Sequence, residues 1–428
     1  MSRLAEPSPR LTIRCRWLIS QTGPPPEAGW VRIERGLITG VGRRNPPGPS
    51  NEQIDLQDTI VLPGLVNAHT HLEFSDFEAP LDATGGLPGW IGRLVHHRRN
   101  LASAGFPAET LARAIDRGLH ESAAAGVAHI GEIASCAPPT PRGPRAPMVR
   151  AYREGLGLRP TGLAAMTNAV SSDLDRLARA GRPAGISPHA PYSVAAPLGR
   201  WLVDSACRRG LPVAMHLHES LEEEEFLASG RGPFRELLER LGAWDSVHPP
   251  PLIAPADWIG LLARAHRGIV VHATHIGRDA LAVARLARHR DRLAVVVCPR
   301  TTRLLSGTLP PVQLLAAAGI RVAIGTDSRA SNPDLSVLAE CRTLVDAGLV
   351  SPGESLRMAT AHGAWAIAAE HRSGRIAVGR SADLVFLQPA TPARDPHAAA
   401  VEPGTRVTAT LRRGRPIFGR LIPTVDPD

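Results

Sequence analysis

The sequence contains no lysine, so all 49 of its basic residues are arginines. Enzymes that form a Schiff base with their substrate need a lysine amine, and P-loop proteins need a lysine beside the bound phosphates. A carbamylated lysine, which bridges two metal ions in some hydrolases, is excluded as well. The absence of a single residue type therefore removes several classes of enzyme at once.

The arginines give the chain a formal net charge of +9, which by itself would suggest a nucleic-acid partner. They are nevertheless scattered along the sequence. Short pairs occur, such as Arg98-Arg99 and Arg208-Arg209, but there is no run of five or more basic residues. Arginine in place of lysine throughout is typical of a codon bias, so we predict no nucleic-acid partner.

Cysteine is scarce, and the five cysteines are widely spaced and never form a Cys-x-x-Cys pair. This pattern indicates neither a disulfide framework nor a thiolate zinc site. No apolar run approaches the roughly 18 residues that span a membrane. The first residues also lack the apolar core of a signal peptide. These absences predict a cytoplasmic protein with no membrane partner.

Short strand-like segments occur at both ends of the chain and set them apart from the middle. They alternate apolar and polar residues between glycines and prolines, which is typical of an antiparallel sheet. We predict that residues 1–62 and 374–428 together form one small β-sandwich domain. The strand-like segments are residues 11–15, 29–34, 37–41, 374–376, 382–387, 406–411 and 415–418.

The middle of the chain, residues 63–373, alternates short apolar runs with helix-like stretches. Strands that alternate with helices indicate parallel βα units. The length of this region suits a (βα)8 barrel of the TIM type, so the predicted fold class is α/β. Helices are predicted in residues 111–125, 278–289 and 354–369, and surface loops in residues 137–147 and 247–255.

Polar residues follow several of the predicted strands, at the rim where βα barrels build their active sites. His69 and His71 come directly after the apolar run 60–66. Side chains at positions i and i+2 of a strand share one face, so both imidazoles can reach one cation. A His-x-His pair is common by chance, however, and indicates a metal site only when further ligands accompany it.

A second group of polar residues ends another predicted strand. His216 could add a third imidazole and Glu219 a carboxylate close by, although His216 or His218 could instead be structural. The acidic run that follows, residues 222–225, is predicted to be the solvated start of a helix, because like charges gain nothing from burial.

Three more strand ends carry a similar residue. His272 ends one of them, and His275 is expected in the loop beyond it. Asp327 ends a strand whose apolar sequence predicts burial. An unpaired carboxylate would be costly there, so a cation or a hydrogen-bond partner is expected. His189 follows a further apolar run.

Imidazoles and carboxylates at successive strand ends of one barrel predict a metal centre. Three neutral imidazoles and one carboxylate suit Zn²⁺ or Fe²⁺ and leave one position open for water. The metal would lower the pKa of that water toward about 7, and a nearby carboxylate would move the protons. We therefore expect one divalent metal ion, zinc in the first place and iron as the alternative.

The motifs resemble those of the amidohydrolase superfamily, and most closely its deaminase and chlorohydrolase branch. The resemblance runs from Pro63-Gly64-Leu65-Val66-Asn67-Ala68-His69-Thr70-His71 to the closing segment 374–384. It implies a metal-dependent hydrolase that deaminates an aminated purine or nucleoside-like heterocycle of the adenosine or aminodeoxyfutalosine type, with release of ammonia. Arg153-Glu154 and residues 325–332 resemble the aminodeoxyfutalosine deaminases in particular.

The resemblance also implies roles for individual residues. Glu219 would shuttle protons, His272 would hold the hydrolytic water, and His189 would contact the substrate. Asp327 would act both as a metal ligand and as a base. The implied ligand set is His69, His71, His216 and Asp327. The lack of lysine favours one metal ion over two, because the dinuclear relatives commonly bridge their metals with a carbamylated lysine.

One segment departs from the family pattern, in which Cys-Pro is often followed by a Ser-Asn pair. In this chain the corresponding sequence is Cys298-Pro299-Arg300-Thr301-Thr302. Arg300 is therefore a candidate substrate-binding residue that could pair with a carboxylate, or a residue that simply lies in the loop.

Several alternatives stay open. The same metal site could remove chloride from a triazine or hydrolyse a cyclic amide. A binding module without catalysis is a remote alternative, because the set of site residues is complete. A nucleic-acid binder would rest on charge alone. A homo-oligomer is an expectation taken from the family.

Overall fold

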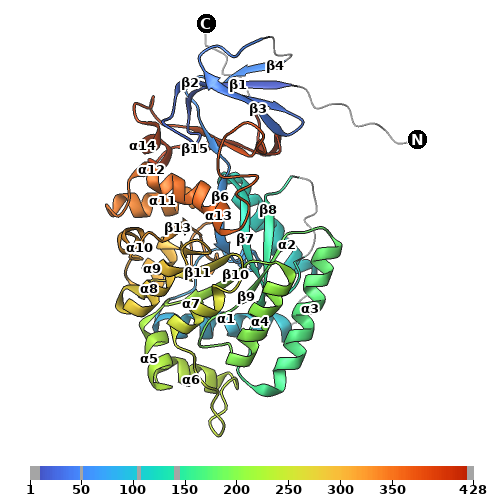
Figure 1. The fold of residues 1–428 in the computed structure, drawn as a ribbon, viewed down its shortest axis with the longest axis vertical. Helices are drawn as coiled ribbons and strands as arrows, with labels where there is room; N and C mark the ends of the chain where they lie inside the picture. The colour runs from blue at the N-terminus through green and yellow to red at the C-terminus, as the bar shows by residue number, and fades with distance from the viewer. Residues whose placement is uncertain (1–9, 49–51, 104–107, 139–144, 422–428) are drawn as a thin grey trace, which may run out of the picture.

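The computed structural model describes residues 10–48, 52–103, 108–138 and 145–421 of the chain. Within these residues the strands form two separate sheets. Figure 1 shows the sheet built from the two ends of the chain at one end of the molecule, and the barrel with its helices at the other.

The barrel consists of eight parallel strands in the order β13-β12-β11-β10-β9-β8-β7-β6. The ring nearly closes where Thr326 and Asp327 both donate their backbone N–H groups to the carbonyl of His69, at 3.1 Å. The strands are buried along almost their whole length, which explains their continuous apolar runs. The strands are β6 (Leu65–Thr70), β7 (Val127–Ala134), β8 (Met148–Gly155), β9 (Ala184–Pro188), β10 (Val213–Leu217), β11 (Gly268–His272), β12 (Leu293–Val297) and β13 (Arg321–Ile324).

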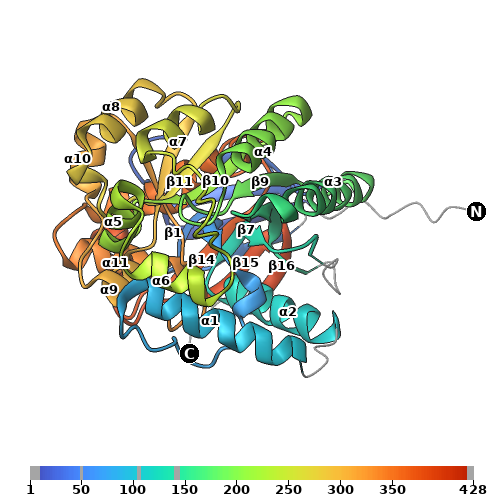
Figure 2. The same cartoon turned by 90° about the horizontal axis from the view of Figure 1, so that it is seen from below.

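Helices surround the barrel, as the end-on view of Figure 2 shows. Close packing between them depends on small residues: a Cβ atom on Gly199 of α4 would lie 2.2 Å from the ring of Trp258 on α7. The helices are α1 (Gly86–Ser103), α2 (Ala108–Ala124), α3 (Leu163–Arg179), α4 (Ala196–Arg209), α5 (Leu221–Ser229), α6 (Pro233–Arg240), α7 (Pro255–Leu262), α8 (Ala280–Arg288), α9 (Pro299–Ser306), α10 (Val312–Ala317), α11 (Val337–Asp346), α12 (Pro352–Arg357), α13 (Gly363–Ala366) and α14 (Pro396–Val401).

The second sheet combines strands from both ends of the chain, in the order β16-β15-β14-β5-β1-β2-β3, with β4 paired to β1. Its core includes Ile13 and Val31 from the N-terminal side and Phe386 and Leu411 from the C-terminal side. The predicted fold class, a βα barrel beside a small β-domain made by both termini, is confirmed. The strands are β1 (Leu11–Leu18), β2 (Glu27–Glu34), β3 (Leu37–Arg43), β4 (Glu52–Asp55), β5 (Ile60–Pro63), β14 (Leu384–Gln388), β15 (Arg406–Arg412) and β16 (Arg415–Gly419).

Two predicted elements differ from the structure. Residues 354–369, predicted as one helix, are divided into α12, a π-helical turn at Met358–His362, and α13. Within that turn the hydroxyl of Thr360 donates to the carbonyl of Leu356 at 2.5 Å, a bond that bends helices. Residues 374–376 were predicted as a strand but form none, since Gly374 adopts a φ of +83° in a tight turn.

The connections between elements agree with the predicted loops where the structure describes them. Residues 247–254 contain no helix or strand, and Pro255 begins α7. Residues 139–144 of the other predicted loop lie outside the described residues. The predicted domain limits at residues 62/63 and 373/374 stay predictions. Across the described ranges, no helix combines the length and apolar character that crossing a membrane requires.

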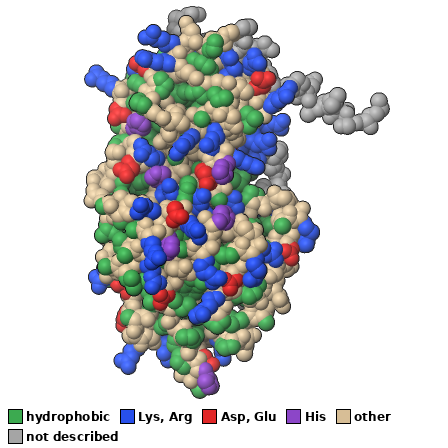
Figure 3. All heavy atoms as spheres, in the orientation of Figure 1, with side chains coloured by type: hydrophobic (Ala, Val, Ile, Leu, Met, Phe, Trp, Pro, Cys, Tyr) green, Lys and Arg blue, Asp and Glu red, His purple; other side chains and the backbone are tan. Residues whose placement is uncertain are grey.

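Arginine side chains are distributed over the face of the molecule drawn in Figure 3, with acidic side chains between them. Several arginines of the barrel helices pair closely with a carboxylate, such as Arg285 with Asp257 at 2.6 Å and Arg209 with Asp175 at 2.6 Å. The positive charge is therefore spread over the barrel and partly balanced by neighbouring carboxylates.

Candidate metal centre and active site

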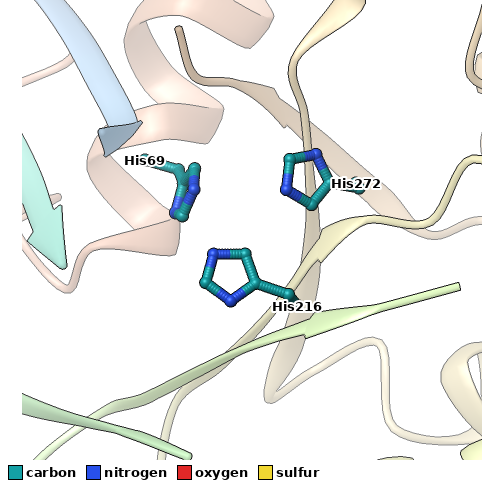
Figure 4. A group of neighbouring side chains, drawn as sticks. All are labelled: His69, His216 and His272. Carbon is teal, nitrogen blue, oxygen red and sulfur yellow. The ribbon is translucent and has the colours of Figure 1, made fainter. Parts of the chain in front are cut away.

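The side chains that the sequence predicted for the site meet at the C-terminal rim of the barrel. His69 from β6, His216 from β10 and His272 from the end of β11 point toward one another (Figure 4). One ring nitrogen of each lies within 4.8 Å of the others. A ring nitrogen of His69, a ring nitrogen of His71 and a carboxylate oxygen of Asp327 lie equally close, so His69 belongs to both groups.

The spacing within these groups fits a divalent cation. Oδ1 of Asp327 lies 3.4 Å from Nε2 of His69 and 3.5 Å from Nε2 of His71. These distances exceed those of charge-assisted hydrogen bonds, which are about 2.7–2.9 Å. A zinc ion bound at about 2.0–2.2 Å from each atom would occupy such a space.

The most direct sign that the site takes a ligand is His69. Its side chain is 1% exposed, and neither ring nitrogen has a hydrogen-bond partner among the described residues. A buried polar atom without a partner is costly, and a cation at Nε2 would remove that cost. The residues present therefore fit a metal ion.

Burial also favours the neutral form that a metal requires at four of the histidines, namely His71, His189, His216 and His272. It lowers the pKa of His71 and of His272 to about 3 and the pKa of His189 to about 4. Burial raises the pKa of Asp327, but the neighbouring histidines, His69 first, outweigh it and hold that pKa well below its usual range. At neutral pH these four imidazoles are thus neutral and Asp327 is a carboxylate.

A hydrogen bond to the backbone selects which nitrogen of His216 is available. Nδ1 of His216 lies 2.8 Å from the carbonyl oxygen of His189, an acceptor, so Nδ1 carries the proton and donates. Nε2 is then free to bind a cation, the arrangement usual for metal-bound histidines. The carbonyl of His189 thereby orients the ring of its neighbour.

Strained backbone occurs at two of the site's strand ends. His272 has a φ of +68° and Asp327 a φ of +55°, in the left-handed region that residues other than glycine rarely adopt. Such conformations persist only where the surroundings impose them, and they are frequent at functional sites.

Glu219 lies beside this centre, where it can exchange protons. Its Oε1 is 3.4 Å from Nε2 of His272. Burial, reinforced by the negative charge of Asp327, raises the pKa of Glu219 well above its ordinary value. A buried carboxyl group with a raised pKa is suited to general acid and base catalysis.

The centre forms the polar floor of a cavity of about 250 Å³. Helices α1 and α6 supply an apolar wall that includes Leu87, Trp90, Leu94, Phe234 and Leu237. Most ligand sites are apolar with a few well-placed polar groups, and this cavity has that character.

Comparison with known proteins identifies the family. Residues 60–417 match the Amidohydrolase family. The chain belongs to the amidohydrolase family. The aminodeoxyfutalosine deaminase of Deinococcus radiodurans is 31% identical to it over 360 residues, which cover 77% of this chain and 78% of that protein. The resemblance predicted from the sequence is confirmed, and with it a hydrolase that acts on carbon–nitrogen bonds.

Solved structures of low identity share the fold of this amidohydrolase. Helicobacter pylori aminofutalosine deaminase, in complex with methylthio-coformycin, superposes with a TM-score of 0.78 at 23% identity, covering 95% of this chain and 100% of that one. A mutant atrazine chlorohydrolase of Arthrobacter aurescens, complexed with zinc and atraton, gives 0.76 at 17% identity, with 97% of each chain covered. At these identities the likeness extends to the fold alone.

The structure places the two predicted substrate-binding residues of the amidohydrolase differently. His189 lines the cavity, with its Nδ1 at 2.5 Å from the hydroxyl of Ser193. Arg300 is not among the residues that line it. Its guanidinium donates to Asp334 at 2.7 and 3.1 Å, and its backbone N–H donates to Glu340 at 2.9 Å.

Three charged residues of the cavity received no role from the sequence: Glu154 at the end of β8, Glu73 after β6, and Arg98 on α1. Oε1 of Glu154 is buried, lacks a hydrogen-bond partner among the described residues, and lies 3.9 Å from Nε2 of His189. Burial raises the pKa of Glu154 to about 7. The position of Glu154 at a strand end is the signal that could have identified it.

The prediction of a solvated acidic run at residues 222–225 is wrong for one of its members. The side chain of Glu223 is 1% exposed, whereas Glu225 is exposed. The carboxylate of Glu223 is buried because it accepts hydrogen bonds from two backbone N–H groups, those of His218 and Glu219. The sequence signal for this is Ser220-x-x-Glu223, the pattern of a helix-capping box.

Proposed function

We propose that this amidohydrolase is a metal-dependent deaminase that releases ammonia from an aminated purine or nucleoside-like heterocycle. The observation that carries the proposal is the combination of unpartnered, buried ligand atoms at His69 with a protonatable carboxyl group at Glu219. The name of the Deinococcus relative supports deamination, and aminodeoxyfutalosine and adenosine-type compounds are the first substrates to consider.

The proposed ligands of one divalent ion are His69, His71, His216 and Asp327. The lowered pKa values of His71 and His216 and the charged carboxylate of Asp327 support this set, and the absence of lysine supports one ion in place of a bridged pair. When bound, the ion would supply a water molecule of lowered pKa beside the substrate. We propose zinc first, in keeping with the zinc in the chlorohydrolase structure, and iron second.

The protein's own groups would move the protons. Glu219 accepts a proton from the attacking water and delivers it to a ring nitrogen, while the water oxygen bonds to the ring carbon that carries the amino group. His272 holds the water by a hydrogen bond from the same side of the cavity as Glu219. Asp327 accepts the second proton of the water and passes it to the amino nitrogen, which leaves as ammonia.

The cavity wall suits a flat heterocycle with an apolar extension. His189 and Glu154 face the space above the metal ligands and would meet polar groups of the substrate. The sequence suggested Arg300 for an anionic group, but Arg98 lines the cavity and Arg300 does not, so we propose Arg98, which also pairs with Glu73 at 3.3 Å. A cytoplasmic location and a homo-oligomer stay predictions.

A second function uses the same site with a different leaving group. Removal of chloride from a triazine, or hydrolysis of a cyclic amide, needs the same water and the same proton transfers. The fold shared with atrazine chlorohydrolase favours the first of these alternatives. The identity of the released product distinguishes them.

Ammonia release by metal-loaded protein tests the proposal. The panel consists of adenosine, methylthioadenosine, adenosylhomocysteine, aminodeoxyfutalosine, guanine and cytosine, with Glu219→Gln as the control. We expect ammonia from at least one nucleoside-like compound and its loss in the variant. No release from any member, with metal bound in stoichiometric amount, would overturn the assignment and lead to tests of halogenated rings and cyclic amides.

A further inference from the structure

Three glutamates are buried beside the active site without lining its cavity: Glu132 on β7, Glu223 on α5 and Glu340 on α11. Their side chains are at most 1% exposed. A buried carboxylate is costly unless hydrogen bonds or charges compensate it. Each of the three is compensated by N–H groups that belong to a segment carrying a proposed site residue.

Glu223 holds the segment that carries Glu219. Its Oε1 accepts the backbone N–H of His218 at 3.1 Å, and its Oε2 accepts the backbone N–H of Glu219 at 2.8 Å. In an ordinary capping box the glutamate bonds to the N–H of the capping residue, here Ser220. The carboxylate of Glu223 reaches past Ser220, so it fixes the peptide units on which the Glu219 side chain is mounted.

Glu132 holds the segment after His71 in the same manner. Both of its oxygens accept the backbone N–H of Leu72, at 3.0 and 2.9 Å. Leu72 follows His71 directly, so this contact restrains the peptide unit next to His71.

Glu340 connects two segments around Asp327. Its Oε1 accepts the side-chain N–H of Asn332 at 2.6 Å, and its Oε2 accepts the backbone N–H of Arg300 at 2.9 Å. The amide of Asn332 also donates to the carbonyl of Thr326 at 2.8 Å, immediately before Asp327. Glu340 therefore holds the strained turn at Asp327 through one intermediate side chain.

We propose that Glu132, Glu223 and Glu340 are positioning residues, and that Glu223 sets the placement of the Glu219 carboxylate for proton transfer. The catalytic part of this inference rests on the proposed function. Misplacement of a reacting group by about 1 Å can reduce the rate by about 100-fold, so a contact outside the cavity is able to control catalysis.

Glu223→Gln is the decisive variant because it keeps the size of the side chain. Its amide group can accept only one of the two backbone N–H bonds and sets a donor against the other. We expect kcat for ammonia release to fall about 30-fold to 100-fold, with KM within about 3-fold of wild type and one metal ion per chain retained. Glu225→Gln, an exposed neighbour on the same helix, is the matched control and should match wild type.

Two further variants separate positioning from stability. Ser351→Ala removes the capping hydroxyl of α12, which lies outside the cavity lining, and should lower the melting temperature with kcat unchanged. Glu340→Gln should weaken metal binding by at least about 10-fold in a chelator competition, since the turn at Asp327 loses a restraint. If Glu223→Gln keeps wild-type kcat, or loses activity only in proportion to its folded, metal-loaded fraction, the proposal is wrong.

Amide hydrogen exchange gives a readout that does not depend on substrate. In Glu223→Gln we expect the N–H groups of His218 and Glu219 to exchange at least about 10-fold faster than in wild type and in Glu225→Gln. Faster exchange with no ammonia from any compound would overturn the proposed function and leave the contact in place. Unchanged exchange and unchanged kcat in an active deaminase would overturn the positioning role alone.

Discussion

Two buried aspartates of this amidohydrolase face histidines, and they are built differently. Asp383 precedes β14 and joins the terminal sheet to the barrel. Its Oδ2 lies 2.7 Å from Nε2 of His129, and its Oδ1 accepts hydrogen bonds from Ser381 and from the backbone of Arg413, both at 2.7 Å. Among the described residues these three partners of Asp383 are at hydrogen-bond distance, so no room is left for a cation between Asp383 and His129.

Asp327 has the same residue types around it but an open geometry. Its Oδ1 lies 3.4 and 3.5 Å from the Nε2 atoms of His69 and His71, and only its Oδ2 has a short contact, at 2.5 Å from the hydroxyl of Ser331. The comparison teaches that spacing, and not residue type, separates a structural pair from a ligand site. A difference of less than 1 Å leaves room for a cation at Asp327 and none at Asp383.

The substitution Asp327→Asn should have the largest effect on activity. Asp327→Asn removes both a proposed ligand and a base, so ammonia release should fall by on the order of 1000-fold or more, with metal affinity reduced in parallel. Metal analysis and an ammonia assay measure the two effects. A variant that binds metal in full and stays active would show that Asp327 resembles Asp383 more closely than its geometry indicates.

The substitution Asp383→Asn should lower the stability of the protein and leave its activity intact. Asp383→Asn weakens three hydrogen bonds at a buried pair, so the free energy of unfolding should fall by about 3 kcal/mol. Activity per folded molecule should stay within about 2-fold of wild type, because the site lies elsewhere on the barrel. Urea unfolding followed by circular dichroism checks the first value, and a large loss of kcat would contradict the division of roles.

Added zinc should stabilise the metal-free protein in a way that depends on Asp327 and not on Asp383. At a free zinc concentration 100-fold above the dissociation constant, linkage predicts a gain of about 2.7 kcal/mol. Asp383→Asn should gain the same increment from its lower starting point, whereas Asp327→Asn should gain little. Thermal melting with and without zinc gives the comparison, and equal gains in both variants would place the ion elsewhere.

The pair of Asp383 and His129 should also affect the stability of the protein in acid. Burial raises the pKa of Asp383, but the hydrogen bond from His129 and the further donors outweigh it, so the folded pKa is below that of the unfolded chain. The stabilisation is present above the unfolded pKa of about 3.9 and is lost as pH falls through the folded pKa. As pH falls below about 4, the wild type should lose stability more steeply than Asp383→Asn, as measured by urea titrations at each pH.

The smallest expected effect concerns the arginine that meets the substrate. Arg98→Ala should raise KM for a substrate with an anionic group by about 5-fold, because the Arg98 guanidinium lines the cavity and is partly screened by solvent. Arg300→Ala should leave KM unchanged, since Arg300 does not line the cavity. The reverse result would restore Arg300 as the substrate contact.

The residues of the centre could be predicted because strand ends in a barrel converge on one rim. His69, His216 and Asp327 each end an apolar run, and that local pattern was enough to bring them together. The terminal sheet was predictable for the same reason, since alternating segments at both ends need a common partner.

The residues that the sequence did not reveal depend on contacts between distant segments. Arg98 lies on α1, and no local pattern states that this helix covers the mouth of the barrel. The sequence places Arg300 just after a barrel strand, where a site residue is expected. In the structure its guanidinium binds Asp334, 34 residues further along the chain, and does not line the cavity. Glu223 lies in an acidic run that local charge assigns to solvent, and only the backbone of Glu219 gives its burial a reason.

The central claim, one cation in a deaminase site, is tested most directly by titrating metal-free protein with zinc while measuring ammonia release from the best substrate of the panel. We predict that the rate rises linearly and stops increasing at one equivalent of zinc per chain. A rate that is independent of zinc, or that requires two equivalents, would contradict the account.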